Sequence, residues 1–318
     1  MSAPGLYLLR RLAQIPLVLA VVTVTVFALI HVTPGDPIQI MLGMETSPEA
    51  VAALRRQYHF DRPLPEQYLI WVTGALRGDL GRSIRQHQPV TQMIAERFPV
   101  SLRLAAGAML LALVLALPAG IVAAVRRNSW LDHLLTGLAV MGLSIPNFTW
   151  ALLLIYAFAV KLDWFPITGV GSSAAGGSFG GALAPLVLPA MALGLQQTAV
   201  LARLLRASML EVLTQDYIRT AYAKGLSRRA VVAGHALKNA LIPLVTITAI
   251  QFGYLVGITI TIEFIFAIPG MGSALLDAVV HRDFPVIQGF TLVMALFFIL
   301  TNLVADVVYT LLDPRITY

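Results

Sequence analysis

Charged residues are scarce in this sequence. Asp, Glu, Lys and Arg make up only 12% of its 318 residues, while hydrophobic residues make up 58%. Soluble proteins carry about 25% charged residues, so this chain lacks the charge that would keep a soluble domain of its size dissolved. Its high apolar content and small net charge of +6 also exclude intrinsic disorder. Long unbroken apolar runs disfavour a membrane β-barrel, whose strands alternate apolar and polar residues.

Cysteine is absent altogether. This excludes disulfides, thiolate metal sites and cysteine nucleophiles. The six histidines form no His-x₃-His pair and none lies deep within an apolar stretch, so we expect no bound metal and no histidine-assisted intramembrane protease. No Gly-Lys-Ser or Gly-Lys-Thr triplet occurs, and a P-loop needs that lysine on the phosphates. We therefore expect no cofactor and no ordinary ATP site in this chain.

Six long stretches do without any charged residue. A helix needs about 20 residues to cross the hydrocarbon core of a bilayer, and within it only helices or closed barrels satisfy every backbone polar group. We therefore predict an all-α polytopic membrane protein with six transmembrane helices. The predicted spans are residues 12–35, 104–125, 134–160, 184–202, 239–262 and 284–305.

The basic residues predict the orientation of these spans. With the N-terminus inside, more than half of the 22 Lys and Arg residues face the cytoplasm, and the short outer loops hold only Lys161 and Arg282. This asymmetry obeys the positive-inside rule, from which long loops are exempt. Six spans then return the C-terminus to the cytoplasm. Topology thus accounts for the basic excess, and we expect no nucleic-acid partner.

The chain divides into three parts. Residues 1–31 form an N-terminal segment with the first span, residues 32–100 an extracytoplasmic cap with short helices near 48–58 and 66–76, and residues 101–318 a five-helix core. The core contains a cytoplasmic loop, residues 203–238, with seven basic and two acidic residues. We predict helix over 204–213, 220–224 and 228–237, with a break at Gly225. This loop is longer and more helical than a simple connection between two spans needs to be. We therefore expect it to contact a cytoplasmic partner.

Ordered motifs give the chain a family resemblance. The loop reads Asp216-Tyr-Ile-Arg-Thr-Ala-Tyr-Ala-Lys-Gly225 and later His235-Ala-Leu-Lys-Asn-Ala-Leu-Ile-Pro243, which resembles the "EAA" signature of permease subunits of bacterial ABC importers. Thr220 stands where the general signature has Glu. Further matching motifs are Pro34-Gly-Asp-Pro37, Asp61-Arg-Pro-Leu-Pro-Glu-Gln-Tyr68, Gly78-Asp-Leu-Gly81, Arg206-x-Ser-Met-Leu-Glu211, Glu263-x-Ile-Phe266, Pro269-Gly270 and Asp313-Pro-Arg315. Together they are most similar to the B-type permease of the dipeptide/oligopeptide/nickel importer family.

The resemblance implies a type I ABC importer permease fold in the bacterial inner membrane. It implies a transport subunit rather than an enzyme, which pairs with a second permease, two ATPase subunits that bind ATP and Mg, and an extracytoplasmic substrate-binding protein. The loop would form a coupling helix docked in a groove of the ATPase, with small residues allowing close approach. The residues that this role implicates are Thr220, Ala221, Ala223, Lys224, Gly225, Arg228 and Arg229.

Two further sets of residues have both a functional and a plain structural interpretation. Polar side chains within the predicted spans, Gln196, Gln197, Thr248 and Gln251, could line a translocation path or simply join helices by hydrogen bonds. Glu263 and Asp283 lie at the outer mouth, and Arg55 and Arg56 lie in the cap. All four could form an outer gate or contact a binding protein, or they could be ordinary solvated residues.

The alternative function is a secondary transporter or channel that works without an ATPase motor. It would need an ion site of its own and would not need the cytoplasmic loop. The sequence leaves open whether the cargo is a dipeptide, a longer peptide, a nickel chelate, haem or a glutathione-like molecule. It also leaves open which intramembrane polar residues would touch that cargo.

Overall fold

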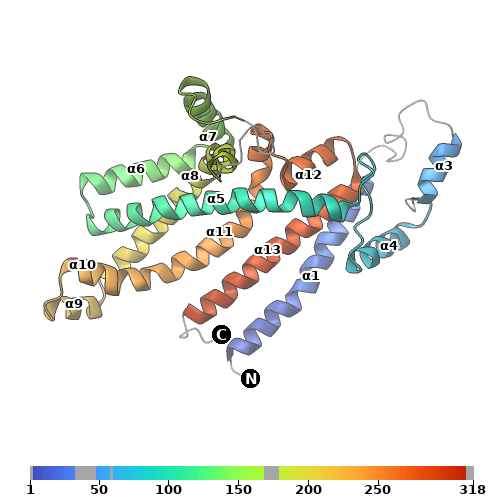
Figure 1. Cartoon of the computed structure of the whole chain (residues 1–318). Coiled ribbons are helices and arrows are strands. Elements are labelled where there is room, and N and C mark those ends of the chain that lie inside the picture. The colour runs from blue at the N-terminus through green and yellow to red at the C-terminus, as the bar shows by residue number, and fades with distance from the viewer. Residues whose placement is uncertain (1–2, 33–47, 58–59, 168–178, 313–318) are drawn as a thin grey trace.

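The computed structural model describes residues 3–32, 48–57, 60–167 and 179–312, most of which are helical (Figure 1). Within these residues the only β-type pairing is an isolated bridge between Arg82 and Pro89. The all-α prediction is therefore confirmed.

Five helices are long and apolar enough to cross a membrane. Each carries a charge-poor stretch that buries its own backbone polar groups in helical hydrogen bonds, as lipid demands. They are α1 (Ala3–Val32), α5 (Val90–Val125), α8 (Phe179–Leu213), α11 (Leu237–Ile265) and α13 (Phe284–Leu312). Helix α5 begins well before residue 104, so the prediction placed the start of this helix too late. Residues 33–35 of the first predicted span lie outside the described residues.

The sixth crossing is a broken helix rather than the continuous one predicted over 134–160. Helix α6 (Trp130–Ser144) is followed by α7 (Asn147–Leu154) and the π-helical segment η1 (Ile155–Lys161), and the two parts are bent by 104°. Ile145 is extended, with φ −92° and ψ 122°, because the ring of Pro146 disfavours a helical residue before it. Hydropathy reports only the apolar length of this stretch and cannot reveal the bend.

Helix α5 and helix α8 form the centre of the bundle, and two glycines let their backbones approach. A Cβ at Gly194 would lie 2.8 Å from the Ala108 carbonyl oxygen, and one at Gly120 would lie 2.9 Å from that of Ala202. Such small-residue contacts are typical of helix packing in lipid, where close van der Waals contact replaces the hydrophobic effect. The core around this pair is aliphatic, with Leu104, Leu201, Leu205 and Leu255 fully buried.

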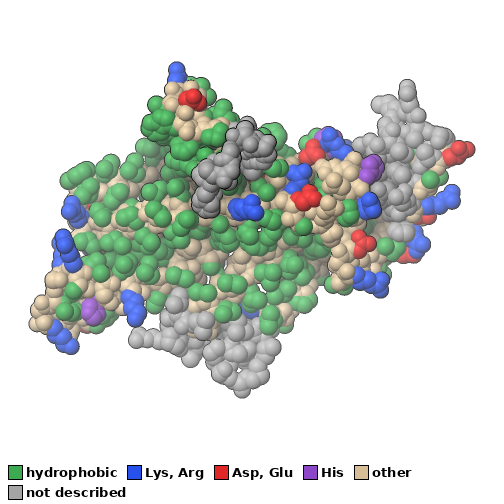
Figure 2. Space-filling model, viewed as in Figure 1, with side chains coloured by type: hydrophobic (Ala, Val, Ile, Leu, Met, Phe, Trp, Pro, Cys, Tyr) green, Lys and Arg blue, Asp and Glu red, His purple; other side chains and the backbone are tan. Residues whose placement is uncertain are grey.

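The polar segments lie at the two ends of this bundle. The cap helices α3 (Pro48–Gln57) and α4 (Leu64–Leu76), close to the predicted positions, lie at one end together with α12 (Met271–Val280) (Figure 1). The opposite end carries α9 (Asp216–Ala223), α10 (Arg228–Val231) and the π-helical turn η2 (Val232–Ala236). Figure 2 shows hydrophobic side chains over the flank between them and charged side chains gathered toward both ends. This distribution is that of a membrane-embedded body with two aqueous ends.

Candidate functional site: the cytoplasmic loop and the buried polar groups

Helix α9 is a short amphipathic helix at the cytoplasmic end. Ile218 and Ala221 are buried with 1% and 6% exposure, and they join the core cluster that also contains Val231 of α10. The opposite side, with Thr220 and Ala223, is exposed. Ala221 therefore packs inside this chain, and the expectation that it would allow close approach of a partner was wrong for this residue. Ala223 keeps the exposed position that such an approach needs.

Gly225 makes the break between α9 and α10. Its φ is +80°, a left-handed conformation that a residue with a Cβ adopts only with strain. The Gly225 amide donates to the Tyr222 carbonyl at 2.9 Å, and the Leu226 amide donates to the Ala221 carbonyl at 3.4 Å, which closes the end of the helix. Ser227 then caps α10 by accepting a bond from the Ala230 amide. The predicted break at Gly225 is confirmed.

The three basic residues that were implicated in coupling have different surroundings. Arg228 donates from Nη2 to the Val125 carbonyl at the C-terminal end of α5, so its guanidinium ties the loop to the bundle and also complements the negative end of that helix dipole. Lys224 and Arg229 are exposed. A partner with acidic groups or free carbonyl groups can reach these two from the cytoplasm.

Three exposed apolar side chains beside these cations escaped the sequence prediction. Tyr217, Tyr222 and Leu226 are 44%, 42% and 40% exposed, and exposed aromatic residues of this kind are enriched in protein interfaces. Tyr217 is also fixed in place, because its hydroxyl accepts a 2.9 Å bond from the Asn239 side chain on α11. No local sequence pattern marks these three side chains as exposed, since Tyr217 and Tyr222 flank the buried face of α9 and Leu226 follows the end of the helix.

The intramembrane polar residues lie on two helices that pack together, α8 and α11. Thr248 is satisfied within its own helix by donating to the Leu244 carbonyl at 2.7 Å, whereas Gln196 and Gln251 are partly buried. Gln197 differs from them: it is 4% exposed, and its Oε1 has no hydrogen-bond partner among the described residues. A buried acceptor left unsatisfied costs about 1–3 kcal/mol, so Gln197 is the member of this set that most needs a further partner.

Glu263 is fully buried with 0% exposure, at the outer end of α11. Its carboxylate accepts from the Ser101 hydroxyl of α5 at 2.6 Å and from the Ser273 amide of α12 at 2.9 Å. The Ser101 hydroxyl in turn accepts from the Met271 amide at 2.8 Å. The Glu263 carboxylate thus lies at the N-terminus of α12 and joins α5, α11 and α12. This role explains the motif that runs from Glu263 to Gly270. A carboxylate buried in this way offers no surface to a binding protein.

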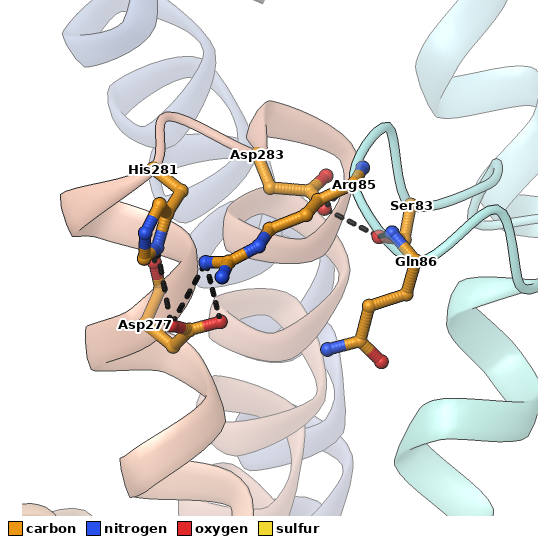
Figure 3. Close-up of polar contacts among 6 residues, drawn as sticks. All are labelled: Ser83, Arg85, Gln86, Asp277, His281 and Asp283. Carbon is orange, nitrogen blue, oxygen red and sulfur yellow. Dashed lines mark hydrogen bonds and ion pairs between the residues drawn. The ribbon is translucent and has the colours of Figure 1, made fainter.

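Asp283 is the second buried carboxylate, with 4% exposure, between α12 and α13. It accepts from the Ser83 hydroxyl and from the amides of Ile84 and Arg85 at 3.2 and 3.3 Å. These donors belong to the outer hairpin, residues 80–90, which Figure 3 shows lying against the α12–α13 turn. Asp283 therefore fastens the hairpin and, like Glu263, is no direct docking group.

An exposed polar contact lies near Asp283, on the preceding helix α12. The Arg85 guanidinium lies 3.2 Å from the Asp277 carboxylate, and His281 Nδ1 lies 3.1 Å from the same group (Figure 3).

Arg55 and Arg56 are exposed on α3, at the far edge of the cap (Figure 1), and the structure does not bring them together with the two buried carboxylates. The described residues contain no group of three His, Asp or Glu side chains that could hold a metal ion.

Two family descriptions match the chain. Residues 6–105 match "Binding-prot-dependent transport system membrane comp, N-term", and residues 116–318 match "Binding-protein-dependent transport system inner membrane component". The chain is 42% identical over 312 residues to the glutathione transport system permease protein GsiC of Escherichia coli O6:H1, covering 98% of this chain and 99% of that protein. It is 41% identical, with the same coverage, to GsiC of Escherichia coli K12 and of Shigella flexneri.

Two solved structures share the fold. The MetNI methionine ABC transporter, in inward-facing conformations, aligns with a TM-score of 0.56 at 17% identity and covers 70% of this chain and 97% of its own. An amino acid ABC transporter crystallised with histidines aligns with a TM-score of 0.52 at 13% identity and covers 71% of this chain and 95% of its own. At these identities the likeness concerns the fold.

Proposed function

This chain belongs to the family of binding-protein-dependent transport system inner-membrane components, and we propose that it carries glutathione or other short peptides inward. Its place in the family makes it the inner-membrane permease subunit of an ATP-binding-cassette importer, and such a subunit is not itself an enzyme. The observation that carries the cargo proposal is the 42% identity, over 98% of this chain, to a glutathione permease. Dipeptides and longer peptides share the backbone amides that intramembrane glutamines can recognise.

Coupling is assigned to the exposed surface of residues 216–229, which we call the coupling segment. Tyr217, Tyr222 and Leu226 supply apolar area, while Lys224 and Arg229 supply positive charge. Together they suit a groove on an ATPase subunit whose rim is acidic. ATP and Mg would bind in two such partner subunits. Thr220, Ala223 and Gly225 would shape this surface, whereas Ala221 and Arg228 would hold it to the bundle.

The translocation path is assigned to the α8–α11 face that carries Gln196, Gln197, Thr248 and Gln251, with a second, homologous permease completing it. The unsatisfied Oε1 of buried Gln197 supports this assignment, because a peptide N–H would supply the missing donor. At the outer end, Glu263 and Asp283 would set the shape of the gate from within, and a binding protein would meet the exposed cap, including Arg55 and Arg56. ATP-driven movement of the coupling segment would shift the population between inward-open and outward-open states.

The test is uptake by proteoliposomes that contain this chain with its second permease, its ATPases and its binding protein. We expect ATP-dependent uptake of labelled glutathione. We also expect unlabelled dipeptides to compete with glutathione for this uptake. Preferential uptake of a nickel chelate or haem would overturn the cargo proposal. Uptake that persists without any ATPase subunit would favour the alternative, a secondary transporter or channel.

A pair of glycine substitutions tests the coupling proposal in the same complex. Gly225→Ala places a Cβ at φ +80° and should distort the turn at a cost of about 1–2 kcal/mol, so that ATP hydrolysis continues while uptake falls. Gly225→Pro should uncouple the two fully, because proline cannot adopt a positive φ. The matched control is Gly234→Ala on η2, where a Cβ meets nothing within 4 Å. Full uptake by Gly225→Pro would refute the assignment.

A further inference from the structure

A groove lies between α1, α11 and α13, and none of its lining residues belongs to the coupling segment. It encloses about 310 Å³. One part of its lining is polar and consists of Arg11, Gln14, Asn302 and Asp306. The other part is apolar and consists of Ile15, Val18, Ile250, Phe298, Ile299 and Leu303.

The polar part is centred on an ion pair between the first and the last long helix. Arg11 Nε lies 3.0 Å from Asp306 Oδ2, and the two side chains keep 46% and 22% exposure. A guanidinium has five N–H donors and can bind more than one oxyanion, and a carboxylate has several acceptor sites. The pair therefore presents one cation and one anion side by side at the groove.

The two parts follow the membrane boundary. Arg11 is the first residue of the apolar span of α1, and Asp306 lies just inside the cytoplasmic end of the span of α13, which runs to Thr310. From Asp306 to Phe298 the helix rises about 12 Å, most of the roughly 15 Å thickness of one leaflet of the hydrocarbon core. The groove is thus polar at headgroup level on the cytoplasmic side and apolar at acyl-chain level.

We propose that this groove binds one glycerophospholipid of the cytoplasmic leaflet that carries a protonated amine in its headgroup, such as phosphatidylethanolamine. The phosphate would lie beside Arg11, the ammonium beside Asp306, and an acyl chain along Val18, Phe298 and Leu303. An anionic headgroup without an amine could also place its phosphate beside Arg11, but it would bring no second cation to Asp306 and would add net negative charge beside that carboxylate. A choline headgroup has no N–H to donate to Asp306, so it should bind less well than an amine.

The experiment measures lipid retained by the purified complex of this chain with its partner subunits. The complex is stripped of lipid, incubated with vesicles of equal parts phosphatidylethanolamine, phosphatidylglycerol and phosphatidylcholine, repurified, and analysed by native mass spectrometry. We expect phosphatidylethanolamine to be retained about fivefold over either competitor. Asp306→Asn should abolish the preference over phosphatidylglycerol, and Arg11→Gln should lower retention of all three lipids.

A substitution in the apolar part tests the site without touching either charge. Val18→Trp fills the groove and should lower retained lipid about tenfold, while Leu17→Trp, on a neighbouring residue with 67% exposure, should leave it unchanged. Equal retention in these two variants, or equal retention of the three lipids by the wild type, would overturn the proposal. Because the chain has no cysteine, Val18→Cys gives a single cross-linking probe, and efficient coupling to the second permease instead of a lipid analogue would show that protein fills the groove. Lipid retention is read without transport, so its outcome is independent of the cargo proposal.

Discussion

The two ends of the bundle stabilise buried carboxylates in different ways. At the cytoplasmic end, Asp132 is 1% exposed and is paired with a cation, since Arg206 Nε and Nη2 donate to its two oxygens at 2.7 and 2.8 Å. At the outer end, Glu263 and Asp283 are equally buried, yet no Lys or Arg of the described residues makes an ion pair with either. Hydroxyl groups and backbone amides satisfy these two carboxylates instead.

The difference bears on how each end can move. A bidentate ion pair joins two helices, α6 and α8, through a single strong and directional contact. Arg206 lies on the same helix that leads into α9, so this contact links the α5–α6 turn to the coupling segment. The outer carboxylates each gather several weaker donors from different segments. We therefore expect the inner ion pair to hold α6 and α8 rigidly together, and we call it a strut. Each outer carboxylate should instead lose its hydrogen bonds one at a time, and we call such a contact a clasp.

The largest expected effect comes from breaking the inner pair. Asp132→Ala leaves a partly buried guanidinium without its partner, and we expect a loss of about 3 kcal/mol in the stability of the complex. Thermal unfolding of the detergent-solubilised complex measures this loss. The double variant Asp132→Leu with Arg206→Met removes both charges and should recover most of it, because apolar residues of similar volume often replace a buried ion pair at little cost.

The double variant also separates stability from function. If it is stable but hydrolyses ATP without uptake, the pair acts as the strut inferred above. If it is stable and transports normally, the ion pair is a packing feature only, and the contrast between the two ends loses its mechanical meaning.

The second effect concerns the clasp at Glu263. A Cβ on Gly270 would lie 2.4 Å from the Glu263 carboxyl carbon, so Gly270→Ala must displace that carboxylate and should cost about 2 kcal/mol. In a Glu263→Ala background the space is free, and the added methyl should cost much less. A double-mutant cycle of thermal stabilities gives this coupling directly. Additive effects of the two substitutions would show that Gly270 is required for some reason other than the carboxylate.

These contacts mark the limit of what the sequence could predict. Charge-poor stretches were enough to locate the apolar crossings, because lipid forces apolar length and helical hydrogen bonding on each of them, whereas the orientation drawn from the basic loops stays a prediction. The break at Gly225 was also predictable, since a glycine between two helical patterns signals a left-handed turn. The bend at Pro146 was not, because a proline in an apolar run is compatible with either a kinked helix or a broken one.

Side-chain partners were the least predictable part of the site. Glu263 and Asp283 were expected at an outer mouth, where solvation is the ordinary state of a carboxylate. Only the contacts of Glu263 with α5 and α12, and of Asp283 with the outer hairpin, show that they are buried. Arg228 was expected to face a partner, and the distance in sequence from Val125 concealed its actual acceptor. Conversely, the exposure of Tyr217 and Leu226 depends on how α9 is seated on α10 and α11, which no local pattern encodes.

The smallest effect lies at the outer hairpin, which contacts both the buried carboxylate of Asp283 and the exposed carboxylate of Asp277 on α12. Asp283→Asn exchanges one acceptor oxygen for an amide group and should cost about 1 kcal/mol, with faster hydrogen exchange at the Ile84 and Arg85 amides that it binds. The matched control is Asp277→Asn, whose carboxylate is 45% exposed where it meets Arg85. An exposed pair contributes well below about 1 kcal/mol and is screened by salt, so exchange at those amides should not change. Equal protection loss in both variants would mean that the hairpin is fastened by the surface pair, and the clasp assigned to Asp283 would then be refuted.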